Sequence, residues 1–377
     1  MAMGMLAIAT TFYSLPDRRR GSPTDAQSVQ LFGSSGGTRY RRGPTESTEQ
    51  RKLGKMRETN RKLLTEKCPH AAGGDAPSGG DGTAGVDMGC GFGVPPLTVD
   101  EIQAELPAFV EVQNRHPKGM LNQGGSMLPH QLALFCLVRR LKPKHIIESG
   151  AHEGLGTWLL RQAAPDAQIT VVSPNQPRSY IDQKPDSVYY VGRKFKDFSK
   201  LLETQRFTDL DKARTLIFFD DHQSGLRRMR MARNAGFTHL IFDDNYVPGA
   251  TSDNLALKQV CNANGTLHAM LGEPLLAKDD FGGRSKPFTK RDLQAWHNEL
   301  KTSVQTYWEF PPLWDVATCN MHSIRPADYT RLTKPPILRV SAPFTEEQRS
   351  AAEKKYVWIN YVQLTPLSGG GGGKTVG

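Results

Sequence analysis

The sequence predicts an α/β fold built on an open, mostly parallel sheet, with helices on both faces and an antiparallel C-terminal edge. Between residues 145 and 261, short β-branched and aromatic runs alternate with amphipathic segments of helix length. This alternation is typical of parallel strands joined by crossover helices. After residue 302 the chain offers apolar and aromatic runs separated by Pro-rich turns, which indicates antiparallel strands.

The predicted elements follow one another in a regular order. Strands are expected at 145–149, 168–173, 188–191, 214–220 and 238–243, and helices at 155–163, 195–204, 224–235 and 253–261. The helix at 224–235 has the clearest pattern, because Leu226, Met229 and Ala232 recur at helical spacing while arginines occupy the other face. Runs at 307–310, 337–340 and 357–364 are expected to close the sheet edge.

Composition divides the 377 residues into three parts. Residues 1–94 are predicted to be a disordered, basic N-terminal tail, 95–367 the α/β domain, and 368–377 a flexible Gly-rich tail. Residues 1–62 hold 12 Lys or Arg and 5 Asp or Glu, so this segment carries +7 of the net charge of +10. Because the basic character lies in the tail, we expect no nucleic acid partner for the globular part.

Residues 1–16 are uncharged and moderately apolar and precede an arginine triplet, so they are a candidate targeting segment. A truncated signal-anchor, an organellar presequence and a frayed tail share this pattern. The stretch is shorter than the roughly 20 residues that span a bilayer, and no well-formed transmembrane helix is predicted. Five widely spaced cysteines without a CxxC pair argue against a disulfide framework and favour a reducing compartment. Cytoplasmic and organellar locations both stay open.

A glycine-rich segment links the first strand to the helix that follows it. Gly150, Gly154 and Gly156 allow a sharp turn and let a ligand approach the main chain. In an open parallel sheet, ligands bind in the crevice at the carboxyl ends of the strands, where this loop is expected to lie. The loop is therefore a candidate ligand cradle, and the alternative is a connection that needs glycine only for tight packing.

Acidic clusters follow the fourth and fifth strands and are expected to meet in the same crevice. Their residues are Asp220, Asp221 and His222 after the fourth strand, and Asp243, Asp244 and Asn245 after the fifth. Because successive side chains on a strand face opposite sides, one Asp of each pair is expected to face the ligand while the other supports the sheet. Carboxylate and amide oxygens suit a hard cation such as magnesium. The alternative is that the aspartates cap the next helix or form Asx turns.

The first strand, the E-x-G-x-x-x-G loop that starts at Glu148 and the strand at 169–172 resemble the first two motifs of class I S-adenosylmethionine-dependent methyltransferases. The resemblance implies a Rossmann-like fold and a cofactor, S-adenosylmethionine, held by Glu148, Gly150, Gly154 and Ser173. Family members usually carry Asp or Glu at the end of the second strand to bind both ribose hydroxyls. Here that position is Ser173, whose hydroxyl makes a weaker, neutral hydrogen bond.

The acidic clusters resemble those of metal-dependent small-molecule O-methyltransferases of the catechol and caffeoyl-CoA type. The resemblance implies that Asp221, Asp244 and Asn245 bind a divalent cation, with magnesium as the candidate ion, and that Asp221 and His222 are catalytic. The family's lysine one turn after the first Asp is Ser224 here, so a general base would be His222, Asp220 or a water. The D-x-H pattern is also shared with methyltransferase-like domains near cephalosporin hydroxylases and sugar O-methyltransferases.

Taken with these resemblances, the residues favour methyl transfer from S-adenosylmethionine to an oxygen of a small molecule or sugar, assisted by a divalent cation. Two alternatives stay open. Ser173 and the absent lysine favour a catalytically silent methyltransferase-like binding module. A different metal-dependent enzyme on the same fold is the other alternative, because a fold does not dictate its chemistry. The sequence names neither the acceptor nor the oligomeric state.

Overall fold

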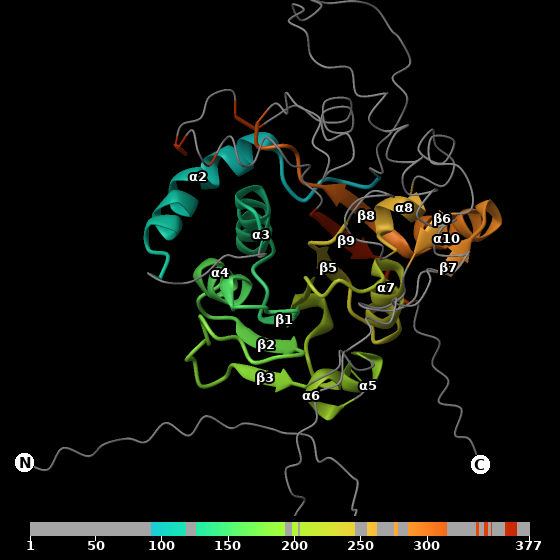
Figure 1. The fold of residues 1–377 in the computed structure, drawn as a ribbon, viewed down its shortest axis with the longest axis horizontal. Coiled ribbons are helices and arrows are strands. Elements are labelled where there is room, and N and C mark those ends of the chain that lie inside the picture. Colours follow the sequence, from blue (N-terminus) through green and yellow to red (C-terminus); the bar gives the residue numbers. More distant parts are fainter. Residues whose placement is uncertain are drawn as a thin grey trace, which may run out of the picture.

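The computed structural model describes residues 92–117, 126–192, 198–202, 204–245, 255–261, 275–277, 286–314, 337–338, 343–345, 348 and 359–367. The segment 1–91 and the tail 368–377 lie outside these residues, so the predictions made for both tails stay predictions. The described residues form a seven-stranded sheet with helices on both faces (Figure 1).

The strand order of the sheet is β3-β2-β1-β4-β5-β9-β8. The strands are β1 (His145–Ser149), β2 (Gln168–Ser173), β3 (Val188–Val191), β4 (Thr215–Phe219), β5 (His239–Phe242), β8 (Val304–Glu309) and β9 (Asn360–Leu364). Strands β1 to β5 pair in parallel, and β9 is antiparallel to both of its neighbours. A separate two-stranded sheet pairs β6 (Leu275–Ala277) with β7 (Lys286–Phe288). The predicted class, a mostly parallel Rossmann-like sheet with an antiparallel C-terminal edge, is confirmed.

Eight described α-helices accompany these strands. They are α2 (Val99–Asn114), α3 (Leu128–Leu141), α4 (Leu155–Ala163), α5 (Phe198–Leu202), α6 (Gln205–Thr208), α7 (Gly225–Asn234), α8 (Leu257–Cys261) and α10 (Lys290–Ser303). Helices α2, α3 and α4 cover one face of the sheet, and α7, α8 and α10 cover the other (Figure 1). Each face of the sheet has its own hydrophobic core, and successive residues of β1 point to opposite faces. Ile146 packs into the core shared with α2, α3 and α4, and Ile147 into the core shared with α7, α8 and α10.

The strand order creates a topological switch point between β1 and β4. From β1 the chain continues outward to β2 and β3 and then returns to form β4 on the other side of β1. In open α/β sheets, loops that leave the carboxyl ends of two such strands diverge to opposite faces, and ligands bind at this point. The glycine loop after β1 and the acidic segment after β4 both start at this point.

Some predicted elements differ from the observed ones. Ile337 and Leu338, expected in a strand, lie outside the strands, and their backbone N–H groups donate to the carbonyls of Pro312 and Leu313. The predicted helix at 253–261 is shorter, since α8 begins at Leu257. Helices α2 and α10 begin with capping boxes that the sequence analysis missed, formed by Thr98 with Glu101 and by Thr289 with Asp292.

Cysteine usage also differs from expectation. Cys261, the last residue of α8, is disulfide-bonded, so the argument from cysteine spacing against a disulfide was wrong and the case for a reducing compartment loses its support. Cys136 in α3 is a buried free thiol. Among the described helices, none combines the length and apolarity that a bilayer span requires.

Candidate functional site

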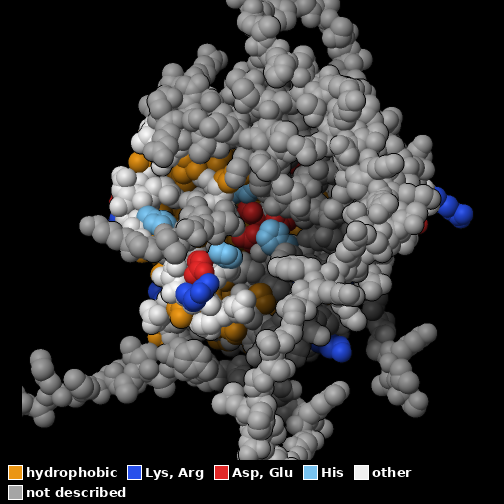
Figure 2. Space-filling view, viewed as in Figure 1, with side chains coloured by type: hydrophobic (Ala, Val, Ile, Leu, Met, Phe, Trp, Pro, Cys, Tyr) orange, Lys and Arg blue, Asp and Glu red, His pale blue; other side chains and the backbone are white. Residues whose placement is uncertain are grey.

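The carboxyl edge of the sheet gathers acidic and histidine side chains beside the switch point. Figure 2 shows red carboxylates and pale blue imidazoles together in a hollow of the described surface. Three of these side chains, from Asp220, His222 and Asp244, each offer one ligand atom, and the three atoms lie within 4.8 Å of one another. The loops after two neighbouring parallel strands, β4 and β5, therefore supply one compact group of donors.

His222 and Asp244 are held together by two contacts to one carboxylate oxygen. The backbone N–H of His222 donates to Asp244 Oδ2 at 2.9 Å, and the ring Nδ1 lies 3.1 Å from the same oxygen. The hydrogen bond between the His222 ring and the Asp244 carboxylate raises the pKa of His222 to about 9. The other oxygen, Asp244 Oδ1, is buried and has no hydrogen-bond partner among the described residues. A buried carboxylate oxygen without a donor is costly, so this atom calls for a ligand.

Asp220 is the one member of the acidic cluster whose negative charge lacks compensation within the described part of the chain. Its carboxylate takes part in no hydrogen bond or ion pair there, while Asp243 and Asp221 each contact a basic side chain. Burial, followed by the nearby charges of Asp243 and Asp244, raises the pKa of Asp220 well above its usual range. A bound cation would relieve the repulsion between Asp220 and these neighbouring carboxylates.

Asp221, the next residue, is held by hydrogen bonds and a buried ion pair to protein groups. Its Oδ2 accepts a hydrogen bond from the Ser149 hydroxyl at 2.6 Å and pairs with the Arg228 guanidinium at 2.7 Å, and its Oδ1 accepts from the backbone of Gln223. Both partners of the ion pair are almost fully buried. The sequence predicted Asp221 as a metal ligand and catalytic residue. In the structure protein donors contact both of its oxygens, and Asp220, not Asp221, belongs to the compact group of three donors, so the role of Asp221 toward a metal stays a prediction.

Asn245 likewise has protein partners for both atoms of its amide. Its Oδ1 accepts from the backbone N–H of Lys258, and its Nδ2 donates to the Tyr307 hydroxyl at 2.7 Å. The same hydroxyl donates to Glu309, whose other oxygen pairs with the fully buried Lys258 at 2.6 Å. The amide predicted as a metal ligand is therefore part of a network that fixes the turn after β5 against α8 and β8.

His130 is a site residue that the sequence analysis missed. It lies in α3, is 1% exposed, and its Nδ1 contacts Asp243 Oδ1 at 2.9 Å. Asp243 is thereby occupied, which leaves Asp244 as the available carboxylate of the pair. The two partners are 113 residues apart, so no local pattern could have connected them.

The glycines of the predicted cradle are required by protein packing. Gly150 has a φ of +97°, and a Cβ there would collide with the backbone carbonyl of Asp220. Gly154 has a φ of +96° and lies against the carbonyl of Tyr180. A Cβ on Gly156 would overlap the carboxylate of Glu148. Packing alone therefore accounts for the glycine pattern, and the glycines do not by themselves demonstrate a bound ligand.

Glu148 lies beneath this loop, fully buried, and accepts a hydrogen bond from the Thr157 hydroxyl of α4. Its Oε1 has no hydrogen-bond partner among the described residues. Burial raises the pKa of Glu148 to about 8. The carboxyl is thus largely protonated near neutral pH, and its role toward a cofactor stays a prediction.

The end of β2 lies next to the glycine loop, as the sequence predicted. Ser173 is buried, and its carbonyl accepts from the backbone N–H of Gly192. Three residues further on, Gln176 has a buried Nε2 without a partner among the described residues. An unused amide donor beyond the second strand suits a hydroxyl or carboxylate oxygen of a ligand, so the residues present fit an adenosine-type cofactor at this one position.

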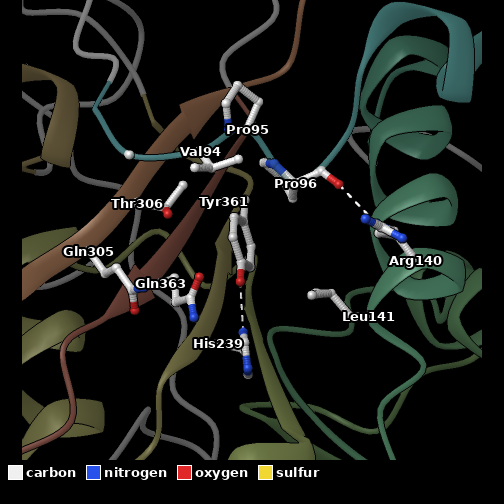
Figure 3. A pocket seen from close by; sticks show the side chains of 11 residues that line it. Val94, Pro95, Pro96, Arg140, Leu141, His239, Gln305, Thr306, Tyr361 and Gln363 are labelled. Atoms are coloured by element: carbon white, nitrogen blue, oxygen red, sulfur yellow. Dashed lines mark hydrogen bonds between the residues drawn. The ribbon is translucent and has the colours of Figure 1, made fainter.

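A cavity of about 550 Å³ opens at the opposite, amino edge of the sheet (Figure 3). Among the side chains that line it are Arg140 from the end of α3, His239 from the start of β5 and Tyr361 from β9. The Tyr361 hydroxyl lies 2.7 Å from His239 Nδ1, and burial lowers the pKa of His239. None of the described residues that line this cavity carries a carboxylate.

Comparisons with known proteins bear on the fold. No protein-family model matches the chain, and no curated protein matches it. Matching solved structures include an O-methyltransferase from Bacillus cereus in complex with SAH, at 16% identity over 38% of this chain and 66% of that one, with a TM-score of 0.26. The SAH-bound methyltransferase PaMTH1 from Podospora anserina matches at 16% identity over 40% and 63%, with a TM-score of 0.25. The O-methyltransferase TomG from Streptomyces achromogenes, in complex with SAM, matches at 13% identity over 68% and 89%, with a TM-score of 0.34.

This chain is therefore similar to structures of methyltransferases, and it spans less than two thirds of the length of the first two described. All three identities are below 25% and all three TM-scores below 0.5. These likenesses therefore concern the fold alone.

Proposed function

We propose that this chain transfers a methyl group from S-adenosylmethionine to an oxygen of a small molecule or sugar, with a divalent cation at the acceptor side. One observation carries the proposal. At the switch point, a glycine loop leaves β1 and a group of two carboxylates and one imidazole leaves β4 and β5. A site for a nucleoside-containing ligand and a site for a cation would then face the same crevice.

In this scheme the loop of Gly150 and Gly154, together with Ser173, would hold the cofactor, with Glu148 supporting the loop from below. The Nε2 of Gln176, which has no partner among the described residues, would donate to an oxygen of the cofactor. When bound, S-adenosylmethionine supplies an electrophilic methyl group. The chain's own contribution is orientation, because methyl transfer requires the acceptor oxygen to lie in line with the bond that breaks.

Asp220, His222 and Asp244 would hold the cation. When bound, such a cation holds the acceptor oxygen and favours its deprotonated form. We assign His222 to the ligand group because its ring belongs to the compact set of three donors. The hydrogen bond between the ring and Asp244 raises the pKa of His222 to about 9, so binding of a cation would release a proton from the ring. Asp221 would position the group indirectly through its pair with Arg228.

A second candidate is a different metal-dependent enzyme on the same fold, with no methyl transfer. Ser173 favours it, since a serine replaces the carboxylate that the methyltransferase resemblance implies at the end of the second strand. The imidazole in the donor group favours it as well, because it widens the choice of metal.

Calorimetric titration of the full chain with S-adenosylmethionine and its demethylated product tests the proposal. We expect micromolar binding that strengthens when a divalent cation is present. The absence of binding with and without cation would refute methyl transfer and direct attention to the second candidate.

Asp244→Ala should abolish cation-strengthened binding and turnover with little loss of folding, since the substitution relieves repulsion among neighbouring carboxylates. Asp166→Ala, at an exposed aspartate in the turn between α4 and β2, is the matched control. Full activity of the Asp244→Ala variant would exclude the cation site.

A further inference from the structure

We propose that the group of Asp220, His222 and Asp244 is a site for a first-row transition-metal dication such as Mn²⁺ or Zn²⁺, and that it prefers these ions over magnesium. The inference rests on the cation site of the proposed function and adds the chemical class of the ion. It depends on the identity of the donors that the fold brings together.

The donors that would have favoured magnesium are engaged elsewhere. An all-oxygen set of Asp221, Asp244 and Asn245 would suit a hard cation. In the structure, Ser149, Gln223 and Arg228 occupy the oxygens of Asp221, and the backbone of Lys258 occupies the amide oxygen of Asn245.

The set that remains contains two carboxylates and one imidazole. Imidazole nitrogen is a preferred ligand of zinc, iron, nickel and copper, whereas magnesium and calcium take oxygen donors. Mn²⁺ shares the oxygen donors of magnesium, but as a first-row transition metal it also binds at mixed nitrogen and oxygen sites. Three protein ligands with further positions left to solvent or substrate are also the usual arrangement at catalytic transition-metal sites. The replacement of an amide oxygen by an imidazole therefore changes the class of ion expected.

A separate observation shows that this group needs a ligand. The Asp244 side chain is 8% exposed, and its buried Oδ1 has no hydrogen-bond partner among the described residues. Asp220, beside it, likewise has no hydrogen bond or ion pair to its carboxylate there. A dication within reach of both would pair the unused oxygen and offset the two negative charges.

The backbone at His222 is built to bring the imidazole into the group. Its φ of +54° is in the left-handed region, which is uncommon for residues other than glycine. The hydrogen bond from its own N–H to Asp244 Oδ2 holds the residue there, so the ring stands beside the carboxylate from the next strand. The same geometry suggests a clean variant, because asparagine tolerates this backbone region and offers oxygen in place of imidazole nitrogen.

The test is direct metal binding to the full chain after dialysis against a chelator. MnCl₂ and MgCl₂ are titrated calorimetrically, and bound Mn²⁺ is counted independently from the loss of the free-ion paramagnetic resonance signal. We expect one Mn²⁺ per chain, bound at least about tenfold more tightly than Mg²⁺. Asp244→Asn should remove this site. His222→Asn should lower the affinity for Mn²⁺ by at least about tenfold, while the affinity for Mg²⁺ should change less.

His152→Asn is the matched control, because His152 is also a histidine in the left-handed region, with a φ of +45°, but it is outside the donor group. It should leave Mn²⁺ affinity unchanged. Equal affinity for Mg²⁺ and Mn²⁺, or a His222→Asn variant that binds Mn²⁺ as the parent does, would overturn the inference.

Titration of S-adenosylmethionine into the same samples separates the two proposals. Cofactor binding without a preference for Mn²⁺ would overturn the inference and leave methyl transfer standing. A preference for Mn²⁺ without cofactor binding would support the inference and refute methyl transfer.

Discussion

Substitution of the two neighbouring aspartates after β4 should give opposite results. Asp221→Asn leaves the Arg228 guanidinium, which is 4% exposed, without the carboxylate that lies 2.7 Å from it. Breaking a buried pair by removing one partner costs about 3–5 kcal/mol, and we expect the lower end because asparagine can still accept the hydrogen bond from Ser149. Asp220→Asn removes a carboxyl group that has no hydrogen bond or ion pair among the described residues and whose ionised form is disfavoured by burial, so the free energy of unfolding should stay unchanged or rise.

Urea denaturation of the full-length variants, followed by circular dichroism, measures the difference. A lower midpoint at an unchanged m-value identifies a change of stability and not of the unfolded state. The double variant Asp221→Asn with Arg228→Met should recover most of the loss, because no unpaired charge stays buried.

Metal affinity should rank the same two variants in the opposite order to their stability. We expect Asp220→Asn to lose Mn²⁺ and Asp221→Asn to retain it under conditions where the variant is folded. If Asp221→Asn keeps parental stability and loses the metal, Asp221 is the ligand after all and our assignment is refuted.

Two further predictions concern the glycine loop. Burial raises the pKa of Glu148 to about 8, so the folded chain binds an extra proton relative to the unfolded chain between about pH 4.5 and 8. The parent's stability should therefore fall across that window as pH rises, by up to about 1.4 kcal/mol per pH unit, and Glu148→Gln should flatten this dependence in urea titrations at several pH values. An equally steep dependence in the variant would contradict this. Gly150→Ala should lower stability by at least about 1 kcal/mol, because alanine is strained at a φ of +97° and its Cβ would meet the Asp220 carbonyl. Gly192→Ala, with no atom within 4 Å of the added Cβ, should melt like the parent, and equal melting of both variants would exclude the packing role of Gly150.

The sheet could be predicted from sequence because its strands have a strong local signal. Strands β1, β2 and β3 have the predicted bounds, since buried parallel strands read as apolar runs between loops. Ile337 was assigned to a strand because its apolar run resembles one, but its backbone partner is Pro312 and not a neighbouring strand. Pairing of this kind depends on distant parts of the chain, which a local pattern does not contain.

For the candidate site, too, local patterns predicted one part, and contacts between separate elements decided the rest. The sequence located the acidic clusters at the correct edge and predicted that one Asp of each pair would face the ligand. It could not decide which one, because the choice depends on side chains that other elements of the fold supply. Ser149, 72 residues away, and Arg228 bind Asp221, and His130 binds Asp243. These partners leave Asp220 and Asp244 as the available carboxylates.

Gly150 connects the two motifs that the sequence presented as separate. Its backbone lies against Asp220 and Asp221, and the backbone N–H of Asp220 donates to the carbonyl of Ser149. A side chain at position 150 would therefore push on the segment that carries Asp220 and His222. The glycine allows the end of β4 to approach β1 closely enough to place a donor at the switch point. On this reasoning Gly150→Ala should weaken Mn²⁺ binding even where the chain stays folded, and its effect on a cofactor would follow from that displacement.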